Sequence, residues 1–156
     1  MTYRFLLPRR ATGVLTRLAD ARRAATAVEF AISALAMVMI VVGVVEFGRL
    51  VWTFEVLQES AAEGARCMGL RANACAASGV YNAANTTSHI VSVALSRGVT
   101  IKASMITLNA AVACGGAAGF SKVSINYGFA TVAPALLTSL ASGFNVAASA
   151  CFPNSS

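Results

Sequence analysis

The hydrophobic and polar positions first mark out one long uncharged run near the N-terminus. From Phe30 to Val45 there are sixteen residues without a charged side chain, which span roughly 24 Å as an α-helix. A bilayer core is about 30 Å thick, so a complete span must include flanking residues. Continuing the helix to Trp52 supplies them and places an amphipathic ring at the outer interface. The run therefore predicts a transmembrane helix.

Helical periodicity continues after this run. An apolar stripe at spacings of three and four consists of Phe54, Leu57, Ala61, Ala65 and Met68. The opposite side carries Glu55, Glu59, Glu63 and Arg66. This pattern is typical of an amphipathic helix in water with one apolar face. We expect one helix over 25–66, embedded in the membrane at first and exposed to water later; two helices with a break near Gly48 are the alternative.

The rest of the chain predicts a small mixed domain. Residues 87–97 (TSHIVSVALSR) have helical spacing, with Thr87 or Ser88 as the N-cap and Gly98 as the terminator. Strands are expected over 99–114, 122–130 and 144–152, a turn over 114–121, and a short helix beginning at Pro134. Because so small a sheet is marginal alone, we expect an α+β fold with an antiparallel sheet packed on the long helix.

Composition and charge agree with an anchored protein and predict its orientation. Only 12% of the 156 residues are charged, against about 25% in soluble domains. Residues 1–24 hold six arginines and one aspartate, so the positive-inside rule puts the N-terminus in the cytoplasm. The expected division is a basic leader (1–24), a transmembrane and stalk helix (25–66) and an extracytoplasmic domain (67–156). A cleaved secretory signal is the competing reading, but no small-x-small site follows the apolar run.

Two carboxylates flank the apolar run. Glu46 and Arg49 are three residues apart, so they share a helix face and can pair where the helix leaves the membrane. Glu29 lies at the other end, where a carboxylate must be solvated, paired or neutral. Hydration at the inner interface is one way to satisfy it.

All four cysteines, Cys67, Cys75, Cys114 and Cys151, lie in the part expected outside the cytoplasm. An even number there indicates disulfides in an oxidising compartment. Four cysteines allow three connectivities and the sequence does not decide between them; we favour Cys67–Cys75, which closes a local loop, and Cys114–Cys151, which joins the sheet ends. A metal site would need closely spaced cysteine pairs supported by histidine. The cysteines here are widely spaced and His89 is the one histidine of the chain, so we expect no metal site.

Enzyme chemistry and nucleic-acid binding are both disfavoured by what the sequence contains. No Asp or Glu follows Glu63, which excludes paired-carboxylate catalysis in the C-terminal domain. His89 has no acidic neighbour to orient it, and CGGAAG lacks the Lys-Ser/Thr of a phosphate loop. The later cations are scattered and follow no nucleic-acid motif. A non-enzymatic protein without a cofactor is the expectation.

The residues around Glu29 resemble a known signal. A basic block ends at Arg23, and ATAVEFA then leads into the apolar run, as in type IV prepilins. More narrowly, ATAVEFA followed by EFGRLVW resembles the TadE-like pseudopilins of Flp/Tad (type IVb) pilus systems, over residues 22–66. The later SINYGFATVAPALL is similar to the tail of those proteins.

The resemblance implies a processing site and a role for Glu29. A prepilin peptidase would cut between Ala24 and Ala25, making Glu29 the fifth residue of the mature chain. The new ammonium and the carboxylate could neutralise each other between subunits and register them. Family members usually have glycine before the cut, where this chain has Ala24, so an uncut anchor is the alternative.

The resemblance also implies partners and a location. The expected partners are the inner membrane, other pilins and pseudopilins, the pilus assembly machinery and the prepilin peptidase. The chain would be a single-pass inner-membrane protein that contributes to a pilus or related secretion apparatus, and would reach the cell surface after assembly. The alternative is an uncleaved periplasmic binding or scaffold protein.

Overall fold

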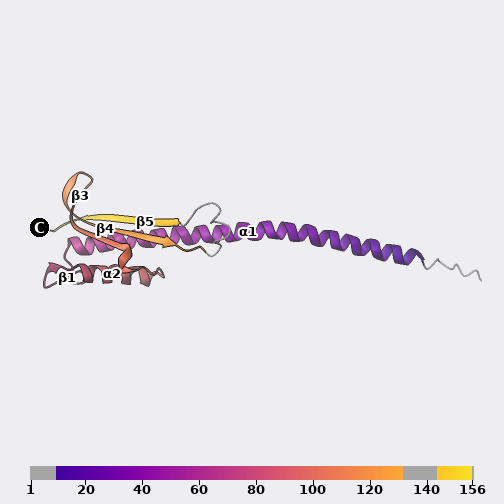
Figure 1. Ribbon diagram of the computed structural model, residues 1–156, viewed down its shortest axis with the longest axis horizontal. Coiled ribbons are helices and arrows are strands. Elements are labelled where there is room, and N and C mark those ends of the chain that lie inside the picture. The colour runs from indigo at the N-terminus through magenta and orange to yellow at the C-terminus, as the bar shows by residue number, and fades with distance from the viewer. Residues whose placement is uncertain (1–9, 132–143, 156) are drawn as a thin grey trace, which may run out of the picture. The chain divides into compact units, whose positions relative to one another are not determined.

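The computed structural model describes residues 10–131 and 144–155 and confirms the α+β class (Figure 1). A long N-terminal helix is followed by a small domain with a three-stranded antiparallel sheet, in the order β3-β4-β5. The elements are α1 (Arg10–Gly69), β1 (Ala76–Ala77), β2 (Val80–Tyr81), α2 (Ala83–Ser96), a 3-10 turn (Ala103–Met105), β3 (Ile106–Cys114), β4 (Ala117–Phe129) and β5 (Phe144–Pro153). The helix expected from Pro134 lies outside the described residues.

Helix α1 extends beyond the predicted range at both ends. It begins at Arg10 and ends at Gly69, and it is continuous through Gly48. A glycine inside a helix costs only about 1 kcal/mol relative to alanine, which neighbouring residues can offset. The two-helix alternative is therefore wrong. Contacts divide the chain into two compact units, Met1–Val45 and Glu46–Ser156.

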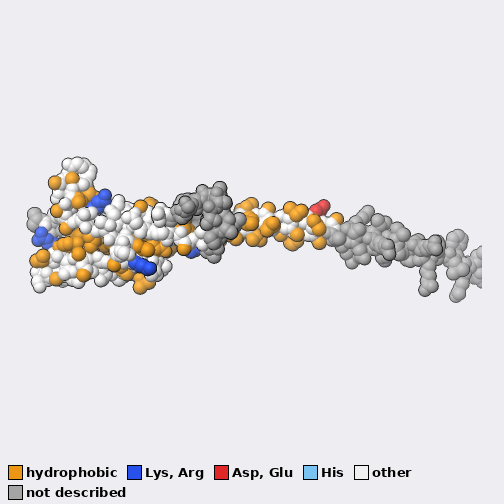
Figure 2. All heavy atoms as spheres, in the orientation of Figure 1, with side chains coloured by type: hydrophobic (Ala, Val, Ile, Leu, Met, Phe, Trp, Pro, Cys, Tyr) orange, Lys and Arg blue, Asp and Glu red, His pale blue; other side chains and the backbone are white. Residues whose placement is uncertain are grey.

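The described side chains of the first unit are almost entirely exposed. Phe30 is 75% exposed and Ile40 is 68% exposed, and the intervening large apolar residues resemble them. Figure 2 shows hydrophobic side chains covering this stretch of α1. Nothing else in the described part of the first unit covers these side chains, so the fold leaves a long apolar surface that requires lipid or protein partners.

The second unit has its hydrophobic core against the last part of α1. Helix α2 and the strands β4 and β5 run beside this part of the helix (Figure 1). The core consists of Val56, Leu57, Ala61, Ala65 and Met68 of α1 with Ile90, Ala94, Val99, Ile101, Val123, Ile125, Val146 and Ala148. The predicted stripe was right except at Phe54, which is 42% exposed.

The buried face of α1 is wider than a single stripe because the helix is contacted by two elements. Glu59 forms an ion pair with Arg97, which caps the C-terminus of α2. The neighbouring Gln58 donates a hydrogen bond from its amide to the carbonyl of Ser149 on β5, at 3.1 Å. Adjacent residues of the helix thus face different elements, and Val56 enters the core with the predicted positions.

The segment between the two helices is a short hairpin rather than a loop. Strands β1 and β2 pair across a turn in which Ser78 and Gly79 have positive φ. Helix α2 then begins four residues earlier than predicted, because the side chain of Asn82 accepts a hydrogen bond from the Asn85 amide at 3.0 Å and caps it. Thr87 and Ser88, the predicted caps, lie inside the helix. Gly98 ends it as predicted, with φ +82° and its amide donating to Leu95.

The sheet is built around β4. Val123 and Ile125 on this strand, which lies in the range expected to be a strand, are fully buried. The predicted turn over 114–121 is mostly strand: only Gly115 and Gly116 connect β3 to β4, and both have the positive φ that a two-residue type I′ turn requires. Irregular register between Asn109 and Cys114 bends β3.

Candidate membrane and assembly interface

The exposed apolar face of α1 is the first candidate interface, and Glu29 lies at its beginning. The side chain of Glu29 is exposed and forms no ion pair within the described residues. Ala25 lies one helical turn before it, and the backbone from Ala24 to Glu29 is helical. The backbone nitrogen of residue 25 therefore lies about one helical turn before Glu29, on the same side of the helix. The geometry leaves this carboxylate available to a partner.

Glu46 and Arg49 form an ion pair near the start of the second unit. The Arg49 guanidinium donates to Glu46 Oε1 at 2.7 Å, and the Glu46 side chain is only 10% exposed. The guanidinium also lies over the Phe129 ring, 5.6 Å from its centroid, a favourable cation–π arrangement. Burying a carboxylate without a cation would be costly. Arg49 thus lets Glu46 be buried and connects α1 to the end of β4.

Two disulfides stabilise the second unit, in the connectivity favoured from the sequence. Cys67 at the end of α1 is bonded to Cys75 just before β1, with 5.8 Å between the Cα atoms. Cys114 at the end of β3 is bonded to Cys151 on β5, with 6.6 Å between the Cα atoms. The first bridge is buried, whereas Cys151 in the second is exposed. Both lie outside the apolar segment, in the part expected to meet an oxidising compartment.

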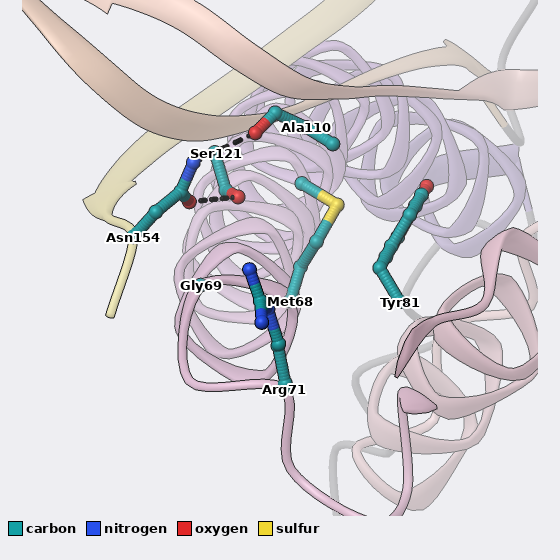
Figure 3. A pocket seen from close by; sticks show the side chains of 7 residues that line it. All are labelled: Met68, Gly69, Arg71, Tyr81, Ala110, Ser121 and Asn154. Atoms are coloured by element: carbon teal, nitrogen blue, oxygen red, sulfur yellow. Dashed lines mark hydrogen bonds between the residues drawn. The ribbon is translucent and has the colours of Figure 1, made fainter. Parts of the chain in front are cut away.

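A small cavity lies beside the end of α1, between the sheet and the β1–β2 hairpin (Figure 3). Its volume is about 80 Å³, well below the roughly 300 Å³ of the smallest ligand pockets. Asn154 closes one side by donating to the Ala110 carbonyl at 2.8 Å and accepting from Ser121 at 2.5 Å. Burial raises the pKa of Tyr81 on the other side. The two hydrogen bonds of Asn154 fasten the C-terminal segment to β3 and β4 beside this cavity.

A protein-family model matches the helical part of the chain. Residues 24–66 match the family model described as TadE-like protein. The match begins beside the proposed cleavage position and includes Glu29, Glu46 and Arg49, but it does not extend into the sheet domain. Comparison with curated proteins and with solved structures gave no match.

This match confirms the resemblance seen in AVEFA and EFGR and indicates a component related to Tad pili. TadE-like proteins are structural pilus components rather than known enzymes. Among the described residues, one helix is long and apolar enough to cross a membrane: Ala25–Gly69 of α1, with a mean hydropathy of 2.5 in its most apolar window. The fold and the match are both consistent with membrane anchoring.

Two structurally important residues were missed by sequence reasoning. Gly64 is given no role by the sequence pattern, but its missing side chain lets Ile90 of α2 pack directly on the helix. A glycine inside an otherwise regular helical pattern was the available signal. The ring of Phe129 contacts the Arg49 guanidinium, and no sequence pattern marks such a contact.

Proposed function

We propose that this protein is a TadE-like pseudopilin, a structural or assembly component of a type IVb (Flp/Tad) pilus or a related secretion apparatus. The observation that carries the proposal is the family match over residues 24–66, on a helix whose apolar side chains are exposed. A helix of this kind is held by lipid before assembly and can exchange lipid for neighbouring helices during it.

In this proposal, residues 1–24 are a cytoplasmic leader, 25–66 the transmembrane and stalk helix, and 67–156 a periplasmic domain. The arginines before the apolar segment support this orientation. The two disulfides on the other side support it as well, since such bonds persist in oxidising compartments. Glu46 and Arg49 would mark the place where α1 leaves the bilayer, with their charges mutually neutralised.

Glu29 would register the subunit against its neighbours. After a prepilin peptidase cuts between Ala24 and Ala25, the free amine is one turn from this carboxylate. A carboxylate costs roughly 3 kcal/mol at the centre of a membrane and less at its edge, and an ammonium from a neighbouring subunit would offset part of the cost that Glu29 incurs. Only one axial position of adjacent helices brings the two charges together, so the pair selects the register. The partners are other pilins and pseudopilins and the assembly machinery.

Substitution of Glu29 tests this role directly. Glu29→Ala and Glu29→Gln are both expected to lower the yield of sheared surface fibres at least tenfold while membrane levels of the chain stay unchanged. Glu55→Ala is the matched control, because it removes an exposed carboxylate from the same helix in the part expected to be in water. Wild-type fibre yield with both Glu29 variants would refute the registry role.

A second candidate is a permanently anchored periplasmic scaffold protein that is never cleaved. It is favoured by the continuity of α1 from Arg10 through Ala24 and Ala25, and by the alanine that stands where prepilins usually have glycine. Intact-mass spectrometry of the chain extracted from membranes separates the two. A chain that starts at Ala25 supports the pseudopilin, and a chain that retains residues 1–24 supports the scaffold.

A further inference from the structure

The structure brings the one histidine of the chain to the buried disulfide. A ring nitrogen of His89 and the sulfur atoms of Cys67 and Cys75 all lie within 4.8 Å of one another. Nε2 of His89 is buried and has no hydrogen-bond partner among the described residues. A buried imidazole nitrogen normally has a partner. The cluster therefore combines two sulfur atoms with an imidazole that has a buried nitrogen without a partner.

The backbone holds these three residues in place independently of the sulfur–sulfur bond. Cys67 is part of α1, and the amide of Cys75 donates to the Ala72 carbonyl at 2.8 Å. The carbonyl of Cys75 accepts from the Asn82 amide at 2.9 Å. It also lies 3.3 Å from the Thr86 hydroxyl, whose shorter contact is with the Asn82 carbonyl at 2.9 Å. None of these hydrogen bonds involves a sulfur atom.

Helix α2 is fixed just as firmly where it carries His89. Thr86 and His89 are three residues apart and share a helix face, so His89 lies on the side of α2 that faces Cys75. The next residue, Ile90, is fully buried against Gly64 of α1. Both cysteines are nearly inaccessible, with exposures of 5% and 0%. The three ligand atoms are therefore preorganised in a site largely shielded from water.

We propose that Cys67, Cys75 and His89 bind a thiophilic divalent cation, Zn²⁺ above all, when the two cysteines are thiols. Two thiolates and an imidazole are ligands that zinc prefers, and three protein ligands leave a fourth position open. Bonds of about 2.3 Å to sulfur and 2.0 Å to nitrogen place such ligand atoms about 3.5–3.8 Å apart around a tetrahedral ion. The three ligand atoms lie within 4.8 Å of one another, so adjustment of the side chains brings them to that geometry once the cysteines are thiols.

The site and the disulfide exclude each other, because each uses the same two sulfur atoms. The newly made chain contains thiols; each binds the cation as a thiolate and releases its proton to solvent. Forming the disulfide removes two electrons and requires an oxidant, such as a dithiol oxidoreductase in its disulfide form, which is itself reduced. From the disulfide, a dithiol reductant must supply two electrons and two protons before the metal binds. This inference does not depend on the proposed pilus function.

Cobalt titration tests the site in the full chain held in detergent micelles. Cys114→Ser and Cys151→Ser leave only the two ligand cysteines, and a phosphine reduces them without competing for metal. Anaerobic Co²⁺ is expected to bind with 1:1 stoichiometry and thiolate-to-cobalt absorption, and Zn²⁺ to displace it. In that background His89→Ala should weaken Co²⁺ binding at least tenfold, while Ser88→Ala, its exposed neighbour on α2, should not. No thiolate-to-cobalt absorption, or equal affinity in the His89→Ala chain, overturns the proposal.

A second measurement does not rely on the stability of the reduced chain. The parent chain, denatured and reduced, is refolded with and without Zn²⁺ in dimethyl sulfoxide as the oxidant, which does not compete for the metal as a thiol buffer would. The two disulfides are timed by trapping and peptide mapping. Zn²⁺ should slow formation of Cys67–Cys75 at least tenfold and leave Cys114–Cys151 unaffected. The His89→Ala chain should lose most of this delay. Identical rates with and without Zn²⁺ contradict the proposal.

Discussion

Gly64 is the residue at which the packing of α1 can be tested most sharply. A Cβ added at this position would lie 2.5 Å from both Cγ1 and Cδ1 of Ile90 and 3.5 Å from Val123 Cγ2. Ile90 is fully buried, so it has little space into which to move. Gly64→Ala should therefore separate α2 from α1 or force Ile90 out of its rotamer.

Two opposing contributions set the size of the effect. Alanine is about 1 kcal/mol better than glycine inside a helix, whereas overpacking a core typically costs about 1–3 kcal/mol. With two atoms only 2.5 Å away, we expect a cost at the upper end of that range. The net loss should be about 1–2 kcal/mol in the free energy of unfolding of the C-terminal domain.

The assay is urea denaturation in detergent followed by near-ultraviolet circular dichroism, which reports the fixed packing of aromatic side chains. Gly48→Ala is the matched control, because nothing lies within 4 Å of the position of its Cβ; it should be neutral or slightly stabilising. In an Ile90→Ala background the clash is gone, so Gly64→Ala should become neutral or stabilising. Equal destabilisation in both backgrounds would refute the steric explanation.

Three further predictions concern the same domain. Asn82→Ala should cost about 1 kcal/mol in thermal or urea denaturation, because it removes the side chain that caps α2; Ser88→Ala should change stability by less than half as much, and equal effects would contradict the capping assignment. Replacing Cys114 and Cys151 by serine opens a cross-link with a sequence separation of 37 and should cost about 4 kcal/mol by chain entropy; a urea midpoint that hardly moves would argue against this bridge. Burial raises the pKa of the Tyr81 hydroxyl above 10.0 in the folded protein. The unfolded chain therefore loses this proton at a lower pH than the folded protein does. The stability that the protonated Tyr81 contributes is complete below pH 10 and is lost as the pH rises toward the folded-state pKa. Tyr81→Phe should flatten the decline in stability measured above pH 10, and an unchanged slope would show that Tyr81 is not its source.

Much of the architecture could be predicted because it depends on local patterns. The charge-free run and the stripe that includes Leu57 and Met68 predicted one long helix. The strand expected over 122–130 is part of β4, the central strand of the sheet. Periodicity reports which side of an element faces the core. The same information could not show that α1 is contacted on two sides, which is why Val56 was missed and Phe54 was misplaced.

The ends of elements and the contacts between distant residues were harder to predict. Asn82 rather than Thr87 caps α2 because the hairpin before the helix fixes the backbone there, and nothing in the helical pattern encodes that hairpin. The approach of His89 to Cys67 and Cys75 depends on how α2 packs on α1. The spacing of these three residues along the sequence does not indicate that they meet, because only tertiary packing brings them together.

The central claim is that α1 crosses the inner membrane and places the C-terminal domain outside the cytoplasm. The two lysines of the chain, Lys102 and Lys122, both lie in that domain, and Lys102 is exposed. A membrane-impermeant amine reagent applied to intact spheroplasts, followed by peptide mass spectrometry, reports the side on which they lie. The account predicts labelling of Lys102 before lysis, to the same extent as after it; labelling that appears only after lysis would contradict the account.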